Sequence, residues 1–386
     1  MTRTPVAVVG GGSAGLAVAA MLRREGVAAL VIESGDDVGT SWATRYDRLQ
    51  LHTHRRLSGL PGQPMPRSLG AWPSRDGVRA YLHAYARAQG LDVLTGTTVE
   101  RIDRDGAGWA LSAGSRTITA GRVVVATGLN AQPVLPEWPG RESFPGPVVH
   151  SADYRNPEPY RGRDALVVGA GNSGAEIAVD LAAGGAARVR LAVRTPPHVV
   201  RRDTAGVPSQ ALGIVLSRLP AWVVDPVAAG LRRVSLPDLS AQGLPPQPRP
   251  YSRFLERRKI PIVDVGIVAA VRRGTVEVVP ALERFDGDEV VLADGSRFRV
   301  DAVVAATGFR PGLEPLVGHL GVLDAAGLPL ARGAQEDPLA PGLHFVGFTV
   351  TFGGALRQVG HEAKAIARHV AAAQRAPAAA PAPTPA

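Results

Sequence analysis

The sequence predicts an α/β fold made of two domains of the same kind. A strand, a glycine-rich turn and a helix follow one another at residues 6–26, and the same succession returns at residues 165–185. Two further segments also resemble each other, RTITAGRVVVATGLN at 116–130 and RFRVDAVVAATGFR at 297–310. Each contains Ala-Thr-Gly near its end. A chain of 386 residues, 45% of them hydrophobic, is long enough to bury two cores.

The composition excludes several functional classes. The chain has no cysteine, which excludes disulfides, thiolate metal sites and thiol-based catalysis. The first residues do not show the positively charged segment and long apolar segment of a secretory signal peptide, so we expect a cytoplasmic protein. No apolar run approaches 18 residues, so we expect no transmembrane segment. The net charge of +9 comes from dispersed arginines and aromatic residues make up only 5%, so we expect no nucleic-acid partner and interpret the surface as suited to anionic cofactors.

The first glycine-rich turn, in VAVVGGGSAGLAVAAMLRREG, is typical of the Rossmann dinucleotide fold. Gly10, Gly12 and Gly15 allow a tight turn, close approach to a pyrophosphate and close helix packing. Glu33, at the end of the next strand, is placed to bind ribose hydroxyls, which favours a nucleotide with a free 2′-hydroxyl such as FAD. The same stretch fits a GxSxG nucleophile motif, but it lies on the first strand without the acid and histidine in the order needed. We therefore interpret Ser13 as a pyrophosphate contact.

The second turn, in ALVVGAGNSGAEIAVDLAAGG, repeats this logic with one change of charge. Arg194 ends the strand after the helix, where the first motif has an acid, and a cation there favours the 2′-phosphate of NADPH. The alternative is that Arg194 is a solvated surface residue. The turn residues expected to bind NADPH are Gly169, Gly171, Asn172, Ser173 and Gly174.

Two further patterns complete the repeat. Residues 97–114 and 275–295 alternate apolar and polar side chains around Asp-Gly pairs, which predicts antiparallel hairpins in each half. The Ala-Thr-Gly triplets at 126–128 and 306–308 are predicted to lie at strand ends, where an ordinary exit into a turn is the alternative interpretation.

These motifs together resemble the class B flavin-containing monooxygenases, and within them the plant YUCCA group that acts in auxin synthesis. The resemblance covers about residues 5–370 and includes YDRLQLH at 46–52, WPSRDGVRAYLHAYA at 72–86 and KIPIVDVG at 259–266. Its most specific part is FPGPVVHSADY, which fits FxGxxxHxxxY at Phe144, Gly146, His150 and Tyr154. The related Baeyer–Villiger enzymes have Trp in the last place, so Tyr154 favours the YUCCA-like side.

The resemblance implies a domain inserted into another domain. The FAD domain would comprise residues 1–158 and 300–372, the NADPH domain 159–299, and a disordered Ala/Pro tail 373–386. It further implies an NADPH- and O2-dependent monooxygenase that acts through a C4a-hydroperoxyflavin, which must be kept from water. It places Trp42, His52 and Thr127 at FAD. It makes His150 part of the linker between the domains, and a catalytic base is the alternative role.

Other functions remain open at this stage. An NADPH-dependent flavin reductase or oxidase, a Baeyer–Villiger ketone monooxygenase and a nucleotide-binding regulator without turnover share the same motifs, whereas disulfide reductases need cysteines. Amines, sulfides, 2-oxo acids similar to indole-3-pyruvate and ketones are all candidate substrates. We expect no metal site, because His52 and His54 lack further ligands at suitable spacing. The apolar segment 209–234 covers a substrate channel, makes a weak membrane-surface contact or packs on the second domain.

Overall fold

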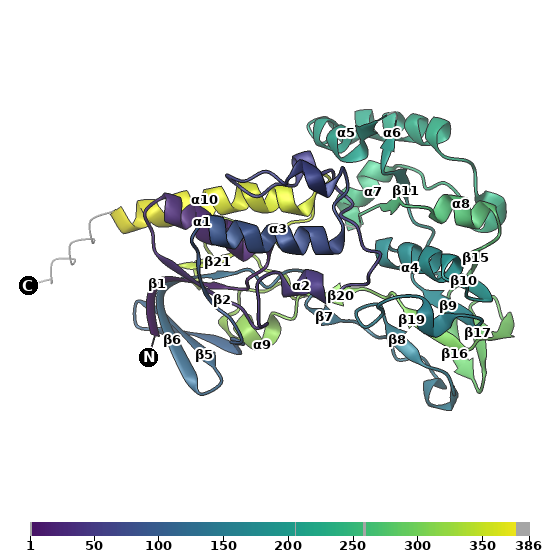
Figure 1. Ribbon diagram of the computed structural model, residues 1–386, viewed down its shortest axis with the longest axis horizontal. Helices are drawn as coiled ribbons and strands as arrows, with labels where there is room; N and C mark the ends of the chain where they lie inside the picture. Colours follow the sequence, from purple (N-terminus) through teal and green to yellow (C-terminus); the bar gives the residue numbers. More distant parts are fainter. Residues whose placement is uncertain (1, 205, 258–259, 376–386) are drawn as a thin grey trace, which may run out of the picture.

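The computed structural model describes residues 2–204, 206–257 and 260–375, which form two α/β domains side by side (Figure 1). This arrangement confirms the predicted fold class. The first domain contains β1 (Thr2–Val9), α1 (Ser13–Arg24), β2 (Ala29–Ile32), α2 (Thr40–Ala43), α3 (Arg75–Ala88), β3 (Asp92–Leu94), β4 (Arg101–Asp105), β5 (Gly108–Ala113), β6 (Arg116–Val125), α9 (Glu314–Val317), β21 (Leu343–Phe345) and α10 (Ala355–Arg375). Its sheet has the order β3-β2-β1-β6-β5-β4, and β21 also pairs with β6.

The second domain has an all-parallel sheet in the order β15-β10-β9-β19-β8. Its strands and helices are β8 (Val148–His150), β9 (Asp164–Val168), α4 (Asn172–Ala183), β10 (Arg188–Val193), β11 (Val199–Arg201), β12 (Asp203–Thr204), β13 (Val207–Pro208), α5 (Ser209–Leu216), α6 (Ala221–Ser235), α7 (Pro250–Arg257), β14 (Ile262–Asp264), α8 (Ile267–Arg272), β15 (Glu277–Pro280), β16 (Leu282–Asp286), β17 (Glu289–Leu292), β18 (Arg297–Arg299) and β19 (Ala302–Ala305).

The predicted hairpins are present in both domains. β4 and β5 pair antiparallel and extend the first sheet through the long strand β6, while β16, β17 and β18 form a separate antiparallel layer. Gly106 and Gly287 have positive φ angles at two of the hairpin turns, which explains the preference for Asp-Gly there.

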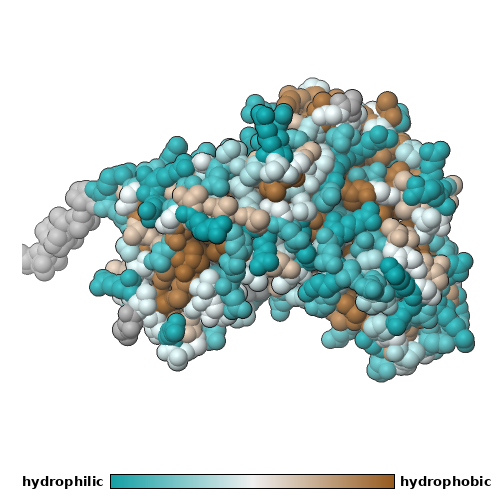
Figure 2. Space-filling model, in the orientation of Figure 1, coloured by the Kyte–Doolittle hydropathy of each residue, from teal (hydrophilic) through white to brown (hydrophobic). Residues whose placement is uncertain are grey.

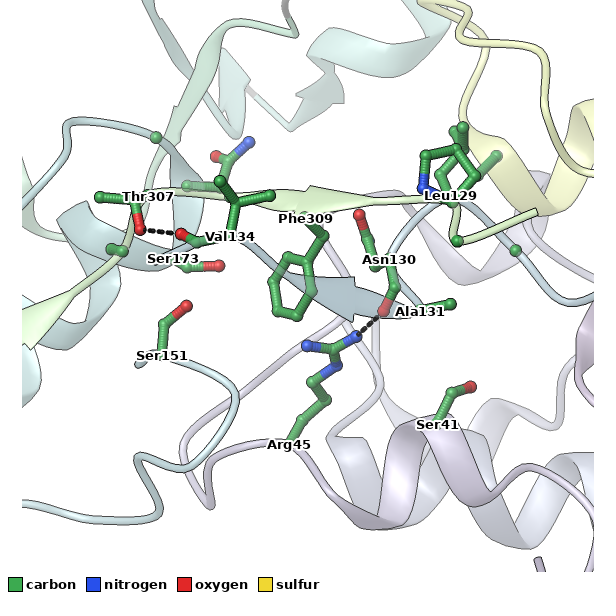
Figure 3. A pocket seen from close by; sticks show the side chains of 18 of the residues that line it. Ser41, Arg45, Leu129, Asn130, Ala131, Val134, Ser151, Ser173, Thr307 and Phe309 are labelled. Carbon is green, nitrogen blue, oxygen red and sulfur yellow. Dashed lines mark hydrogen bonds between the residues drawn. The ribbon is translucent and has the colours of Figure 1, made fainter. Parts of the chain in front are cut away.

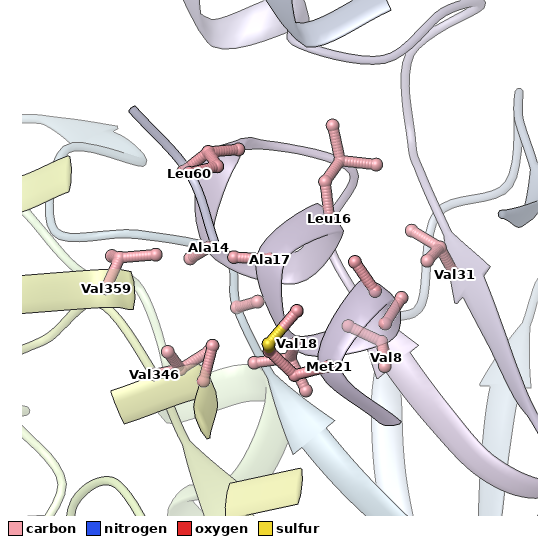
Figure 4. Close-up of a cluster of buried hydrophobic side chains, with 14 of the residues drawn as sticks. Val8, Ala14, Leu16, Ala17, Val18, Met21, Val31, Leu60, Val346 and Val359 are labelled. Carbon is pink, nitrogen blue, oxygen red and sulfur yellow. The ribbon is translucent and has the colours of Figure 1, made fainter. Parts of the chain in front are cut away.

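The core of the first domain surrounds α1. Residues 14–22 of this helix are all buried, because the sheet, α3 and α10 cover it on different sides. Figure 4 shows Leu16, Ala17 and Met21 of α1 together with Val346 and Val359 from the C-terminal part of the chain. The C-terminal segment therefore returns to the first domain and completes its core, as expected for an interrupted domain.

Two connections join the domains, and they are hydrogen-bonded to each other. β7 (Gln132–Pro133) leads into the second domain and β20 (Phe309–Arg310) leads out of it, and the two pair antiparallel. The Val134 amide also donates to the Gly308 carbonyl at 3.0 Å. The two connections thus form one short ribbon between the domains (Figure 1).

The strand pairing suggests domain limits other than those expected from the sequence. Strands β8 and β19 lie outside the expected range 159–299, yet both belong to the second sheet. We therefore propose that the inserted domain runs from about residue 147 to about residue 306. Residues 373–375 of the expected tail belong to α10, and residues 376–386 lie outside the described part of the chain.

In the described ranges, no helix is both long enough and apolar enough to cross a membrane.

Candidate functional site

A cavity of about 1740 Å³ lies between the two domains. This is well above the roughly 300–1,000 Å³ of an ordinary small-molecule pocket, so there is room for more than one nucleotide. Both glycine-rich turns and both Ala-Thr-Gly triplets contribute to its wall. The expected site residues that line it are Gly10, Gly12, Ser13, Glu33, Trp42, His52, Thr127, Gly169, Gly171, Asn172, Ser173 and Arg194.

The glycines of the first turn have two distinct roles. A Cβ atom added at Gly15 would lie 1.8 Å from the Gly10 carbonyl oxygen, so helix α1 can pack against the turn only without a side chain here. A Cβ atom added at Gly12 would meet no atom within 4 Å. Gly12 therefore leaves free space at the N-terminus of α1, where unpaired amides and the helix dipole attract phosphate.

The second turn repeats this geometry closely. A Cβ atom at Gly174 would lie 1.8 Å from the Gly169 carbonyl oxygen, and one at Gly171 would again meet no atom within 4 Å. The N-terminus of α4 thus offers a second phosphate cradle that faces the same cavity.

The Ala-Thr-Gly triplets have a structural role that the sequence alone did not reveal. The first glycine of each turn has a positive φ, and an added Cβ would lie 2.7 Å from the Ala126 oxygen at Gly10 and 2.4 Å from the Ala306 oxygen at Gly169. Each triplet therefore presses its backbone on the first glycine of a cradle. The repeat of the triplets is a consequence of this close packing in both domains.

Glu33 is buried at the end of β2 and lines the cavity. Its carboxylate accepts the Gly11 amide at 2.6 Å and the Gly35 amide at 2.9 Å. A carboxylate has about four acceptor positions, so it can still accept ribose hydroxyls while these two bonds fix its orientation.

Arg194 occupies the equivalent place in the second domain. It is exposed at the cavity wall, and it forms no ion pair within the described part of the chain. Asn172, which also lines the cavity, has a structural contact as well. Its amide bridges to β14 by accepting the Val263 amide at 2.8 Å and donating to Pro261 at 3.3 Å, so it fixes the start of α4.

His150 lies in residues 144–154, which we call the linker; it is the last residue of β8, at the edge of the second sheet, and does not line the cavity. The Nδ1 atom accepts the Ala152 amide at 3.1 Å, and Nε2 donates to the Gly308 carbonyl at 3.1 Å. Burial lowers the pKa of His150, which favours the neutral ring. Since both ring nitrogens are occupied by backbone groups, the geometry suits a residue that joins the two connections and leaves no nitrogen free for proton transfer.

The other residues of FPGPVVHSADY pack the linker onto the second domain. Phe144 contacts Phe285 with ring centroids 5.0 Å apart, and a Cβ at Gly146 would lie 2.5 Å from the Asp301 oxygen. The Tyr154 hydroxyl donates to Asp180 of α4 at 2.8 Å, and burial together with Asp180 raises its pKa. The short distance from Gly146 to the Asp301 backbone leaves no room for a side chain, which explains the glycine at this position.

Acidic residues of α4 bind the first domain, which sequence reasoning missed. Glu176, buried on α4, accepts the Tyr46 hydroxyl at 3.0 Å and contacts the His52 ring. Asp180, one turn further, lies 3.6 Å from Arg48. His52 thus lines the cavity and also binds the opposite domain. The sequence did offer one sign of this contact, because Glu176 and Asp180 are spaced by four in an otherwise apolar helix and therefore lie on the same side of it.

Arg45 was also missed. Figure 3 shows its guanidinium pointing between Phe309 and Asn130 in the cavity wall. It lies 4.7 Å from the Phe309 ring centroid and donates to the Asn130 carbonyl at 3.5 Å. The His150 ring also contacts Phe309, with ring centroids 5.0 Å apart. Burial lowers the pKa of Arg45. No carboxylate pairs with Arg45 in the described residues, so the cavity contains a cation with free donors.

A group with metal-ligand chemistry lies elsewhere, where the sequence led us to expect none. Ligand atoms of Glu336, His344 and His369 lie within 4.8 Å of one another. The Arg122 guanidinium already donates to Glu336 at 2.6 Å, and this cation disfavours a second cation at the same carboxylate.

Comparisons with known proteins agree on one family. A protein-family model described as pyridine nucleotide-disulphide oxidoreductase matches residues 7–208. The chain is 34% identical over 357 residues to indole-3-pyruvate monooxygenase YUCCA1 of Oryza sativa subsp. japonica, with 89% of this chain and 86% of that protein covered. It is 32% identical to probable indole-3-pyruvate monooxygenase YUCCA7 of Arabidopsis thaliana, with 94% and 86% covered. A flavin-containing monooxygenase from Stenotrophomonas maltophilia matches with a TM-score of 0.75 and 28% identity, covering 97% of this chain and 100% of that chain.

Proposed function

Because the chain belongs to the flavin monooxygenase family, we propose that it binds FAD and NADPH and uses O2 to insert one oxygen atom into a small organic substrate. The observation that supports the proposal best is the pair of cradles facing one cavity. Gly12 and Gly171 leave free space at two helix N-termini, with an acid beside the first cradle and a cation beside the second.

The residues present fit both nucleotides. Glu33, held by two backbone amides, would accept the ribose hydroxyls of FAD, and Arg194 would pair with the 2′-phosphate of NADPH. When bound, FAD supplies the chemistry that takes a hydride from NADPH and activates O2. The contribution of the protein is to fix the two sites relative to each other and to exclude water.

The linker contacts support this positioning role. His150, at the end of β8, binds Gly308 of the outgoing connection, while Tyr154 and Tyr46 bind α4 through Asp180 and Glu176. The start of α4, which forms the second cradle, is thereby connected to the first domain through buried hydrogen bonds. Such bonds are strong where water is excluded.

Arg45 favours an anionic substrate among the candidates. The two plant relatives described above are named as indole-3-pyruvate monooxygenases, and the free donors of Arg45 in the cavity would pair with a carboxylate. A 2-oxo acid is therefore the first substrate to test, followed by a sulfide, an amine and a ketone.

The experiment that tests the proposal uses oxygen labelled with oxygen-18. A monooxygenase incorporates one labelled atom into the product for each NADPH consumed. A flavin reductase or oxidase consumes NADPH and yields hydrogen peroxide without labelled product, and this result with every substrate class would refute the proposal. Conversion of a ketone to an ester or lactone would instead identify Baeyer–Villiger activity.

A further inference from the structure

The helices α5 and α6 present apolar side chains to solvent. Of the thirteen large apolar residues that are exposed in the described chain, seven lie in residues 209–235. Val234 is 91% exposed, Trp222 79% and Val215 61%, and the others are Leu212, Leu219, Val227 and Leu231. Figure 2 shows apolar residues gathered over these helices at the top of the molecule. We call this surface the apolar cap face.

Helix α6 exposes more large apolar side chains than an ordinary surface helix does. Its outward side carries Trp222, Val227, Leu231 and Val234, whereas Asp225 is buried beneath it. The Asp225 carboxylate accepts the Tyr251 amide at 2.7 Å and the Ser252 amide at 3.2 Å, and so it holds the start of α7. Asp225 therefore has partners inside the protein, whereas these four apolar side chains of α6 are exposed among the described residues.

Helices α5 and α7 are fixed to the rest of the protein on the side opposite the apolar cap face. Gln210 of α5 is buried, donates to the Gly353 carbonyl at 2.7 Å and accepts the His54 amide at 2.9 Å. Phe254 of α7 packs on Phe352 with ring centroids 3.9 Å apart, and Phe254 also lines the cavity. The apolar cap face is thus the outer surface of a layer whose inner surface closes the cavity.

Within residues 209–235 the charged side chains that reach solvent are all positive, and the exposed acids Asp238 and Glu256 lie outside this segment. Arg218 and Arg233 are exposed and Arg232 is half-buried, while Asp225, the one acid of residues 209–235, is covered. A symmetric dimer through this face would bring the same arginines of both copies together, which is unfavourable. An anionic lipid surface complements both features, because its headgroups pair with arginine and its acyl boundary accepts Trp and aliphatic side chains.

We propose that the apolar cap face docks the protein on the surface of a membrane that contains anionic lipids. Docking is peripheral, since no described helix is able to span a bilayer. Trp222 lies at the level of the headgroups, where an indole ring is favoured, and the arginines contact the phosphates.

Vesicle flotation with the purified full-length chain tests the proposal. The protein should float with vesicles of phosphatidylcholine mixed with phosphatidylglycerol and bind phosphatidylcholine alone much more weakly. Replacing both Trp222 and Val234 with Ser should lower the partition coefficient on the order of tenfold or more. Arg232→Gln with Arg233→Gln should lower binding to the anionic vesicles by about fivefold per arginine. Leu330 and Leu339 are 58% and 67% exposed outside the cap, so replacing both with Ser is the matched control and should leave binding unchanged.

Two results overturn the proposal. One is equal vesicle binding by the wild type and the Trp222/Val234 variant. The other is a wild-type dimer in light scattering that becomes monomeric in that variant, because a second copy of the chain would then cover the face. Thermal unfolding of each variant near the wild-type temperature shows that a loss of binding does not come from a loss of fold.

Discussion

Replacing His150 with Ala separates a linker role from a catalytic one. The substitution removes two hydrogen bonds, to the Ala152 amide and the Gly308 carbonyl, from a side chain that is 6% exposed. It also removes the ring that contacts Phe309. At about 1 kcal/mol for each hydrogen bond, with a further contribution from lost packing, the free energy of unfolding should fall by about 2–3 kcal/mol.

The functional effect should appear in coupling. With a true substrate, NADPH should still be consumed while hydrogen peroxide rises at the expense of oxygenated product, because a loosened linker admits water between the two sites. Peroxide and product are measured together against NADPH. His361→Ala, at an exposed position of α10, is the control and should keep the wild-type ratio.

The pH dependence gives a second readout. Burial lowers the pKa of His150 in the folded protein below the value of about 6.5 in the unfolded chain. The stabilisation of the fold by the neutral His150 ring is therefore complete above about pH 6.5 and is lost as the pH falls through the folded-state pKa. The stability difference between wild type and His150→Ala should therefore shrink below about pH 6.5. A variant with wild-type stability and low peroxide but slow product formation would instead show that His150 acts as a base, and would refute the linker role.

Three further predictions follow from single positions. Gly12→Val should give folded but colourless protein, because the valine side chain would occupy the phosphate site without meeting a protein atom. Gly15→Val should fail to fold, because its side chain would meet the Gly10 backbone. FAD retained in Gly12→Val would contradict the first site. Arg194→Ala should raise the KM for NADPH about tenfold or more, from the loss of a charge-assisted bond of about 1.5–3 kcal/mol, with NADH unchanged; an equal effect on both cofactors would contradict phosphate recognition. Burial and Arg232 lower the pKa of His198 to about 4. In urea unfolding, the free energy of unfolding should therefore fall below about pH 6.5, by up to about 1.4 kcal/mol per pH unit. His198→Gln should flatten this pH dependence.

The sequence was sufficient for the parts that depend on local geometry. A strand, a turn with glycines at fixed places and a helix can pack in few ways, so Gly10, Gly15, Gly169 and Gly174 predicted both cradles. The hairpins were equally predictable, because the Asp-Gly pairs favour positive φ angles at their turns.

The contacts between distant segments could not be predicted in this way. Glu176 looked like an ordinary helix residue until the fold brought Tyr46 and His52 to it from the other domain. Arg45 carries no motif of its own, and its place beside Phe309 depends on how the outgoing connection runs. The domain limits that we propose from the sheets differ from the expected ones for the same reason, since the pairing of β8 and β19 is not visible in either strand alone.

The ribbon formed by β7 and β20 has a mechanical consequence. Two domains joined by one chain can swivel about single bonds, whereas two hydrogen-bonded strands limit this rotation, because the φ and ψ angles of both strands have to change together. Opening of the domains about this ribbon also has to break the bonds from Tyr46 to Glu176 and from Gln210 to Gly353, which cross between the domains. Solution scattering or a pair of fluorescent probes should therefore find one narrow distribution of the angle between the domains.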